Sequence, residues 1–295
     1  MIKKLTIVTP SYNRAHTLPK VYSSLVKQSN RSFKWLIIDD GSKDRTEELV
    51  NSFINEGSIE IRYVKKDNGG KASALNLALD IIDTVYCTCL DSDDWFSDDA
   101  VNRALQLLDE EKENNKCCGV LAIRNNPDGS VMGTVKIPRN YKYITPDNLY
   151  NDLGFSSELI CFYKTEIAKK YRFPIIPKEK FIPPSWFHYA ICEQHCFRTS
   201  WDCLCFCEYV ADGLTRNKRK IIVDNPKGYT LIKKISFEHS RRFKRKFKNG
   251  TMYVCGSILS KNKDWLKNAP SKSIALLVLP VAVSVYFIRF KRLKK

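Results

Sequence analysis

The regular alternation of strand-like and helix-like segments over residues 1–110 is the feature that most restricts the fold. Short runs rich in Val, Ile, Thr and Leu are typical of buried strands, and the segments between them carry apolar residues at helical spacing. The strand-like runs cover residues 5–9, 33–39, 59–64 and 85–90, and the helical ones cover 16–29, 45–53, 71–82 and a stretch with Val101, Leu105 and Leu108. This order predicts an α/β fold with a doubly wound, mostly parallel sheet.

Polar motifs follow the strand-like runs one by one. "PSYNR" follows the first run, "DDGSKDRT" the second, "KKDNGGK" the third and "DSDD" the fourth. In a parallel sheet, ligands bind beyond the carboxyl ends of the strands, so the sequence predicts that these loops share one crevice. Two glycines before a helix, with Lys71 beside them, favour the close approach of an anion. Each motif by itself is also typical of an ordinary turn before a helix.

The motif "DSDD" is the most specific of these signals. Ser97, Asp98 and Asp99 already supply the cap and first-turn acids for the next helix, so capping does not explain Asp91 and Asp93. Carboxylates held together need a compensating cation or hydrogen-bond donors. Exposed carboxylates at a strand end can hold a hard cation that in turn binds phosphates, which predicts a site for Mn²⁺ or Mg²⁺.

The ordered set "TPSYNR", "IIDDGSKDRT", "DNGGKASALNLAL" and "CLDSDDW" resembles glycosyltransferase family 2, whose members are inverting enzymes with a GT-A fold that use nucleotide sugars. A weaker similarity to bacterial surface-polysaccharide transferases continues through "EKFIP" and "EYVADGLT". The resemblance implies that Asp93 coordinates the metal that bridges the two donor phosphates. It also implies a set of donor-binding residues: Pro10, Tyr12, Asn13, Asp40, Asn68, Gly70, Lys71 and Asp91.

The resemblance predicts transfer of a sugar, from a UDP-linked donor, to a glycan or lipid-linked acceptor in bacterial surface-polysaccharide synthesis. An inverting transfer needs a base to take the proton of the incoming hydroxyl. Relatives usually carry an acid after a stretch like "EKFIP", whereas this chain has Pro184 and Ser185 there. Glu179, His188 and Glu193 are alternative candidates for the base, and each is also typical of a structural or solvated residue.

The sequence divides into two parts by composition. We expect a catalytic domain over residues 1–225, with a nucleotide-sugar half at 1–110 and an acceptor half at 111–225, and a basic helical extension over 226–295. "CGVLAIR" and "SVMGTVKI" around "NNPDG" predict a hairpin. Residues 274–288, "IALLVLPVAVSVYFI", are short for a membrane span. They predict an interfacial or re-entrant segment on an anionic membrane, or a buried helix.

Net charge and cysteine usage restrict the partners and the compartment. The formal charge of +17 is concentrated near the C-terminus, and no nucleic-acid-binding motif accompanies it, so we expect no nucleic-acid partner. The odd count of 11 cysteines and the absence of a signal-like N-terminus favour a reducing cytosol, with the protein peripheral on the inner face of the cell membrane. The cluster from Cys192 to Cys207 is typical of buried thiols more than of a zinc site.

Two other functions remain open from the sequence. A nucleotidyltransferase would share an acidic metal site on an α/β sheet, but the ordered loop motifs count against it. A non-catalytic protein that binds a nucleotide sugar or a glycan, and that lost its base, is kept open by "IPPSW".

Overall fold

A computed structural model describes residues 2–208 and 218–291, and most of the "EYVADGLT" stretch lies outside them. Its central sheet has the strand order β3-β2-β1-β4-β8-β6-β9-β7. The strands are β1 (Leu5–Ser11), β2 (Phe33–Asp39), β3 (Ile61–Lys65), β4 (Tyr86–Cys89), β6 (Cys117–Ile123), β7 (Tyr143–Ile144), β8 (Leu159–Lys164) and β9 (Cys196–Ser200). A separate antiparallel pair joins β5 (Trp95–Phe96) to β10 (Cys205–Phe206).

The first half of the sheet is parallel and doubly wound, as the alternation predicted. β1 pairs in parallel with β2 and β4, and β2 pairs in parallel with β3. On one face lie α1 (Leu18–Val26), α2 (Thr46–Glu56) and α4 (Ala100–Glu110), and on the other lie α3 (Lys71–Ile81), α5 (Thr165–Ala168) and α6 (Ser185–Ile191). Both faces of the sheet are therefore covered, which explains why its strands are nearly continuous apolar runs.

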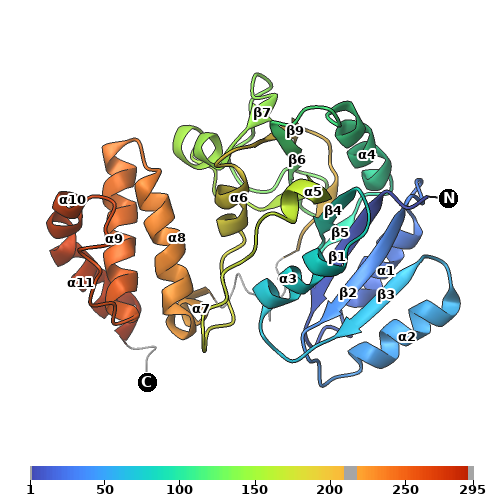
Figure 1. Cartoon of the computed structure of the whole chain (residues 1–295), viewed down its shortest axis with the longest axis horizontal. Coiled ribbons are helices and arrows are strands. Elements are labelled where there is room, and N and C mark those ends of the chain that lie inside the picture. The colour runs from blue at the N-terminus through green and yellow to red at the C-terminus, as the bar shows by residue number, and fades with distance from the viewer. Residues whose placement is uncertain (1, 209–217, 292–295) are drawn as a thin grey trace.

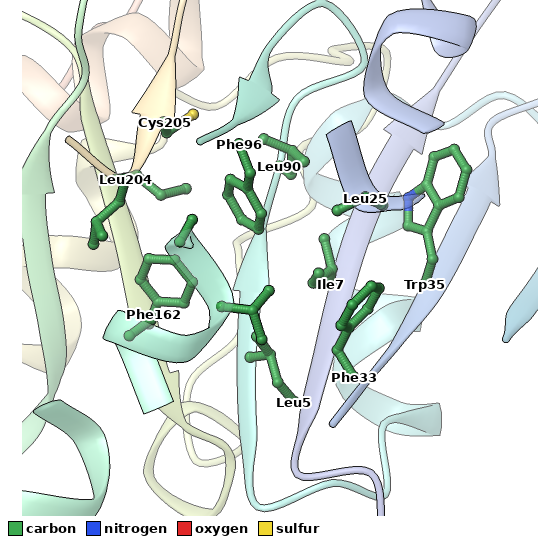
Figure 2. Close-up of a cluster of buried hydrophobic side chains, with 14 of the residues drawn as sticks. Leu5, Ile7, Leu25, Phe33, Trp35, Leu90, Phe96, Phe162, Leu204 and Cys205 are labelled. Carbon is green, nitrogen blue, oxygen red and sulfur yellow. The ribbon is translucent and has the colours of Figure 1, made fainter. Parts of the chain in front are cut away.

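Alternate residues of each strand enter different cores. Leu5, Phe33 and Trp35 belong to the core beneath α1 and α4, whereas Val8 and Leu36 belong to the core beneath α3. Figure 2 shows the first of these cores, where aromatic and aliphatic side chains from the strands meet those that lead into β5 and β10. Its apolar packing holds the strand ends, and the loops that follow them, in fixed positions.

The second half of the sheet departs from the predicted hairpin. The turn is present, and in it the backbone N–H of Asn126 donates to the backbone oxygen of Ser130 at 2.8 Å. The residues after the turn do not form a strand, and they make only an isolated bridge between Asn125 and Val131. β6 instead pairs antiparallel with β8 and parallel with β9. The hairpin prediction was wrong in this respect, since strands distant in sequence bury both edges of β6.

The C-terminal residues form a helical lobe with its own core (Figure 1). Its helices are α7 (Lys218–Asp224), α8 (Pro226–Glu238), α9 (Phe243–Leu259), α10 (Lys272–Leu277) and α11 (Leu279–Arg289). α8 and α9 form an antiparallel pair, and α10 and α11 pack on α9 through Ala275, Val278 and Ala282. Within the described ranges, no helix has both the length and the apolarity needed to cross a bilayer. The domain boundary at residue 225 stays a prediction.

Candidate active site

A cleft of ≈ 920 Å³ opens at the carboxyl ends of the parallel strands. The loops after β1, β2, β3 and β4 all contribute to it, as the sheet-edge argument predicted. Most of the predicted donor-binding and metal residues line it together: Pro10, Tyr12, Asp40, Asn68, Gly70, Lys71, Asp91 and Asp93.

Asn13 is not among the residues that line the cleft. Its backbone lies in the left-handed region at φ 54°, and its side-chain oxygen accepts the N–H of Lys43 at 2.8 Å. Its own N–H donates to the hydroxyl of Ser42 at 2.8 Å. Asn13 therefore ties the loop after β1 to the loop after β2, and its direct contact with a donor stays a prediction.

Asp40 organises the glycine loop after β3. Its carboxylate accepts the backbone N–H groups of Gly69 at 2.9 Å and Gly70 at 2.7 Å, and it forms an ion pair with Lys66 at 2.8 Å. The amide of Asn68 donates to the Asp40 backbone oxygen at 2.8 Å. These bonds join two loops into one wall of the cleft.

Gly70 is needed where it lies. Its φ is +88°, and a Cβ at this position would stand 1.9 Å from the backbone oxygen of Lys180. The segment around Lys180 therefore packs directly on the glycine loop, at the entrance to α3. Only glycine permits both the backbone angle and this close approach.

Three carboxylates meet two cations at the end of β4, the buried Arg124 and the half-buried Lys71. Asp91 forms ion pairs with Lys71 and, at 3.3 Å, with Arg124. Burial opposes ionisation of Asp91, but these two cations hold its pKa well below the ordinary value. Asp94 is buried and pairs with Arg124, and burial together with the neighbouring acids raises its pKa to about 7 despite that pairing.

Asp93 is the carboxylate of this cluster that faces the cleft without a bound partner. Among the described residues, no side chain donates a hydrogen bond or an ion pair to it, although Arg14 and Lys71 lie near enough to favour its charge. Burial and the charge of Asp91 raise its pKa. A partly buried anion beside another anion fits a divalent cation, which would need only one such carboxylate if phosphates supply further ligands.

The three candidate bases lie in different surroundings. His188 on α6 lines the cleft, and burial together with the charge of Arg124 lowers its pKa to about 4. The carboxylate of Glu179 accepts the backbone N–H groups of Lys227 at 2.9 Å and Gly228 at 2.8 Å, at the start of α8. Glu179 and the exposed Glu193 are not among the residues that line the cleft. The geometry thus brings only His188 of these three to the site.

Among the cleft residues that sequence reasoning missed are Arg124 and Glu158. Arg124 directly follows β6, and Glu158 precedes β8, which runs antiparallel to β4 and β6. The start of β8 and the end of β6 therefore reach the same sheet edge as Asp91. The signal was a charged side chain at the edge of an apolar run, after the run for Arg124 and before it for Glu158, and its use required the direction of β8.

The cysteines form no visible metal centre. All 11 are free, and in the described part of the chain no group of three His, Cys, Asp or Glu side chains is placed to share an ion. Of the cluster that was expected to hold buried thiols, Cys205 and Cys207 are buried, whereas Cys192, Cys196 and Cys203 are half-buried.

Comparison with known proteins identifies the family. The model of "Glycosyl transferase family 2" matches residues 6–172 of this chain. The chain belongs to glycosyltransferase family 2. It is 35% identical over 132 residues to chondroitin synthase of Pasteurella multocida (strain Pm70), and 33% identical over 107 residues to glycosyltransferase GlyA of Streptococcus pneumoniae. These matches cover 44% and 36% of this chain but only 13% and 15% of those proteins.

Solved structures match nearly the whole chain. Residues 1–349 of TarS from S. aureus, in complex with UDP, align with a TM-score of 0.57 at 15% identity, over 99% of this chain and 90% of that one. The mannosyltransferase PcManGT from Pyrobaculum calidifontis, in complex with GDP-Man and Mn²⁺, gives a TM-score of 0.57 at 16% identity, over 100% and 83%. At this identity the likeness shows the fold alone, which is GT-A.

Proposed function

We propose that the protein is an inverting glycosyltransferase that moves a sugar from a nucleotide sugar, UDP-linked, to a glycan or lipid-linked acceptor. The observation that carries the proposal is the acid cluster at the end of β4, in which Asp93 faces the cleft with no ion-pair partner among the described residues. Membership of family 2 favours this reading over a nucleotidyltransferase. The likeness to TarS bound to UDP supports the choice of donor.

A metal fits this arrangement. Asp93 would hold a Mn²⁺ or Mg²⁺ ion, and Asp91 would stay ionised beside it because of Lys71 and Arg124. When bound, the ion stabilises the negative charge that develops on a departing diphosphate. Asp40, through the amides of Gly69 and Gly70, keeps the glycine loop in the shape that a nucleotide would meet.

Glu158 is the residue that we assign as the base. Among the acids of the cleft, Asp40, Asp91 and Asp94 are held in ion pairs, and Glu208 is paired with Lys20 at 3.0 Å. Asp93 is reserved for the cation. Glu158 lines the cleft, and no ion pair engages its carboxylate among the described residues. His188 differs from it because its Nε2 lies 3.6 Å from the sulfur of Cys161, and because burial and the charge of Arg124 make it a weaker base than an ordinary histidine.

The apolar outer face of α10 and α11 supports a membrane location. Side chains at helical spacing expose large apolar groups on the side away from α9, including Leu277 at 58% and Ile288 at 78%. Lys272 and Lys291 flank this face. A helical hairpin with an apolar outer face and basic ends suits the surface of an anionic bilayer, where a lipid-linked acceptor would lie. We therefore place the enzyme on the cytoplasmic side of the membrane.

The test is turnover of UDP-sugars with Mn²⁺ by the full chain, including the slow hydrolysis that occurs without an acceptor. We expect one UDP-sugar to be consumed, with a loss of roughly 10²–10³-fold in Glu158→Gln. His188→Asn should lose less than tenfold. UDP binding without any turnover in the wild type would instead support a non-catalytic binding protein, which Pro184 and Ser185 at the start of α6 favour.

A further inference from the structure

The cleft reaches well beyond the donor loops, and its two ends differ in charge. Every acidic side chain of the described residues that lines it comes from the sheet half: Asp40, Asp91, Asp93, Asp94, Glu158 and Glu208. The opposite end is built by α7, α8 and α9, which contribute Ile221, Ile222, Tyr229, Lys233, Arg245 and Asn249. The described part of this helical end brings two cations and no acid to the cleft.

Arg245 is the clearest sign of a missing anion. It lies near the start of α9, and a Cβ at Gly154 would come within 2.9 Å of its Nη2, so its side chain rests against the loop at Gly154. Among the described residues, no carboxylate forms an ion pair or a hydrogen bond with its guanidinium. Arg245 is only partly exposed, whereas its neighbours Arg242 and Lys244 are exposed. A partly buried guanidinium without an acceptor is unfavourable.

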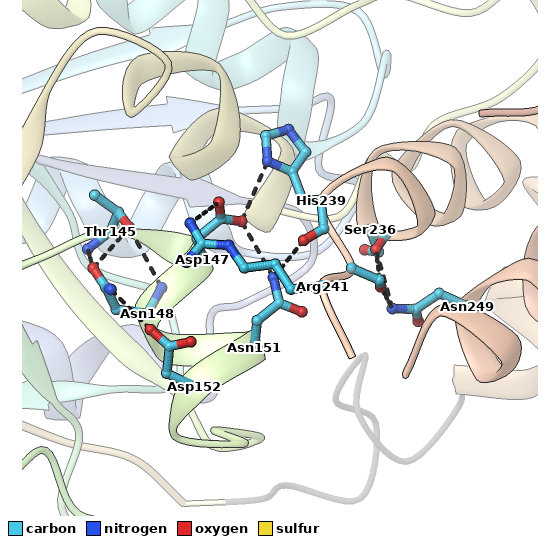
Figure 3. A network of polar contacts seen from close by, with 10 residues as sticks. Thr145, Asp147, Asn148, Asn151, Asp152, Ser236, His239, Arg241 and Asn249 are labelled. Carbon is cyan, nitrogen blue, oxygen red and sulfur yellow. Dashed lines mark hydrogen bonds and ion pairs between the residues drawn. The ribbon is translucent and has the colours of Figure 1, made fainter. Parts of the chain in front are cut away.

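The local electrostatics increase this deficit of negative charge. Arg245 lies in the first turn of α9, where the helix dipole is positive and where the helix carries no acid. Asp147, in the loop that faces α8 and α9, is already engaged by His239 at 3.2 Å and Arg241 at 3.4 Å (Figure 3). Asn151 also donates to it at 3.2 Å. The Asp147 carboxylate therefore pairs with His239 and Arg241 and does not neutralise Arg245.

The walls around the two cations are apolar. Ile222 and Ile232 line the same end of the cleft, and Lys233 lies over the ring of Tyr229 at 5.7 Å. Apolar surface beside a cation fits an amphiphile with an anionic group. The site thus differs from the donor end, where amides and carboxylates dominate.

We infer that the helical end of the cleft binds an anionic acceptor, with Arg245 receiving a phosphate or carboxylate group that lies next to an apolar chain. The inference rests on the proposed function, because it assigns the acceptor of the same reaction. It adds that a neutral acceptor binds less tightly than an anionic one of the same shape.

The test compares three probes on the full chain, with UDP and Mn²⁺ at saturation so that the donor end is filled. The probes are octyl phosphate, octyl β-D-glucuronide and octyl β-D-glucoside, each below the concentration at which it forms micelles. By calorimetry we expect the wild type to bind at least one anionic probe about tenfold more tightly than the glucoside. Preference for the phosphate alone points to a phosphodiester acceptor, and preference for both points to any anionic glycan or lipid.

Variants separate this site from a general basic surface. Arg245→Ala should reduce the preference to within about twofold, and Arg245→Lys should keep part of it. Lys244→Ala removes an exposed cation one residue away and should leave the preference intact. Thermal melts and UDP titrations on each variant establish that the fold and the donor end are preserved. Equal binding of all three probes by the wild type, or a preference that survives Arg245→Ala, would overturn the inference. A wild type that does not bind UDP would instead overturn the proposed function.

Discussion

The two ends of the cleft handle charge in opposite ways. At the sheet end, the acids other than Asp93 and Glu158 have partners: Asp40 holds two backbone amides, and Asp91 holds Lys71 and Arg124. At the helical end, Arg245 has no such partner among the described residues. A donor end of this kind is pre-organised before its ligand arrives, whereas the acceptor end depends on its ligand to complete the charge balance. The variants below test that difference, from the largest expected effect to the smallest.

Gly70→Ala tests how rigid the donor end is. We expect a loss of about 3 kcal/mol or more in the free energy of unfolding, because the new Cβ would meet the Lys180 backbone oxygen at 1.9 Å. The matched control is Gly57→Ala, which has a φ of +70° but no atom within 4 Å of the new Cβ, and it should lose only about 1 kcal/mol. Urea titrations measure the free energy of unfolding of both variants. Equal losses would mean that the glycine loop moves to accommodate the new Cβ and is not rigid.

His188 tests the boundary between the two ends through pH. Its pKa is lowered from 6.5 to about 4 in the folded state, so it contributes stability above pH 6.5 that is lost as the pH falls toward 4. The full loss is at most about 3 kcal/mol. His188→Gln should therefore flatten the fall in stability between pH 6.5 and 4, as measured by urea titrations at a series of pH values. If the free energy of unfolding falls with pH as steeply in His188→Gln as in the wild type, burial does not lower the pKa of His188.

Asn225→Ala tests whether the helical lobe holds the donor end. The Asn225 side chain accepts the backbone N–H groups of Lys180 at 2.7 Å and Phe181 at 3.0 Å, directly beside Gly70. Its loss leaves both N–H groups without this acceptor, and we expect about 2 kcal/mol less stability and weaker UDP binding. Asn225→Asp keeps the acceptor oxygens and is the control. If Asn225→Ala binds UDP as tightly as the wild type, the helical lobe does not hold the donor end in its binding conformation.

The apolar face of α10 and α11 gives the smallest expected effect. The double variant Leu277→Ser and Ile288→Ser should bind anionic vesicles about tenfold less than the wild type in a flotation assay, because less apolar surface enters the interface. Ile175→Ser, which changes an equally exposed apolar residue elsewhere, should bind like the wild type. If the wild type, the double variant and Ile175→Ser all bind the vesicles equally, the apolar face of α10 and α11 does not contribute to membrane binding.

The donor end could be predicted from the sequence because each of its motifs directly follows a parallel strand. Each parallel strand ends at the same sheet edge, so Asp40, Lys71, Asp91 and Asp93 could be brought together from their places after strands. Asn13 was expected in the cleft, but its side-chain oxygen is used by the Lys43 amide, a contact that no pattern reveals.

The acceptor half could not be predicted in the same way because its pairing is not local. β6 pairs with β8 and β9 rather than with the residues that follow its turn, and only the antiparallel course of β8 brings Glu158 to the cleft. Glu179 looked like a candidate base in the sequence, yet it accepts two amides of α8, an element that begins 47 positions later. Such contacts depend on tertiary packing, which sequence spacing does not encode.

The most direct test of the account is calorimetric titration of UDP in the presence of Mn²⁺ and of EDTA, with the wild type, Asp93→Asn and Asp98→Asn. Asp98 is an exposed neighbour and serves as the control. We predict that Mn²⁺ strengthens UDP binding by the wild type and by Asp98→Asn, and that Asp93→Asn loses this gain while it stays folded. A Mn²⁺-dependent gain that persists in Asp93→Asn would contradict the account, because the unpartnered carboxylate would then not be the group that joins metal and donor.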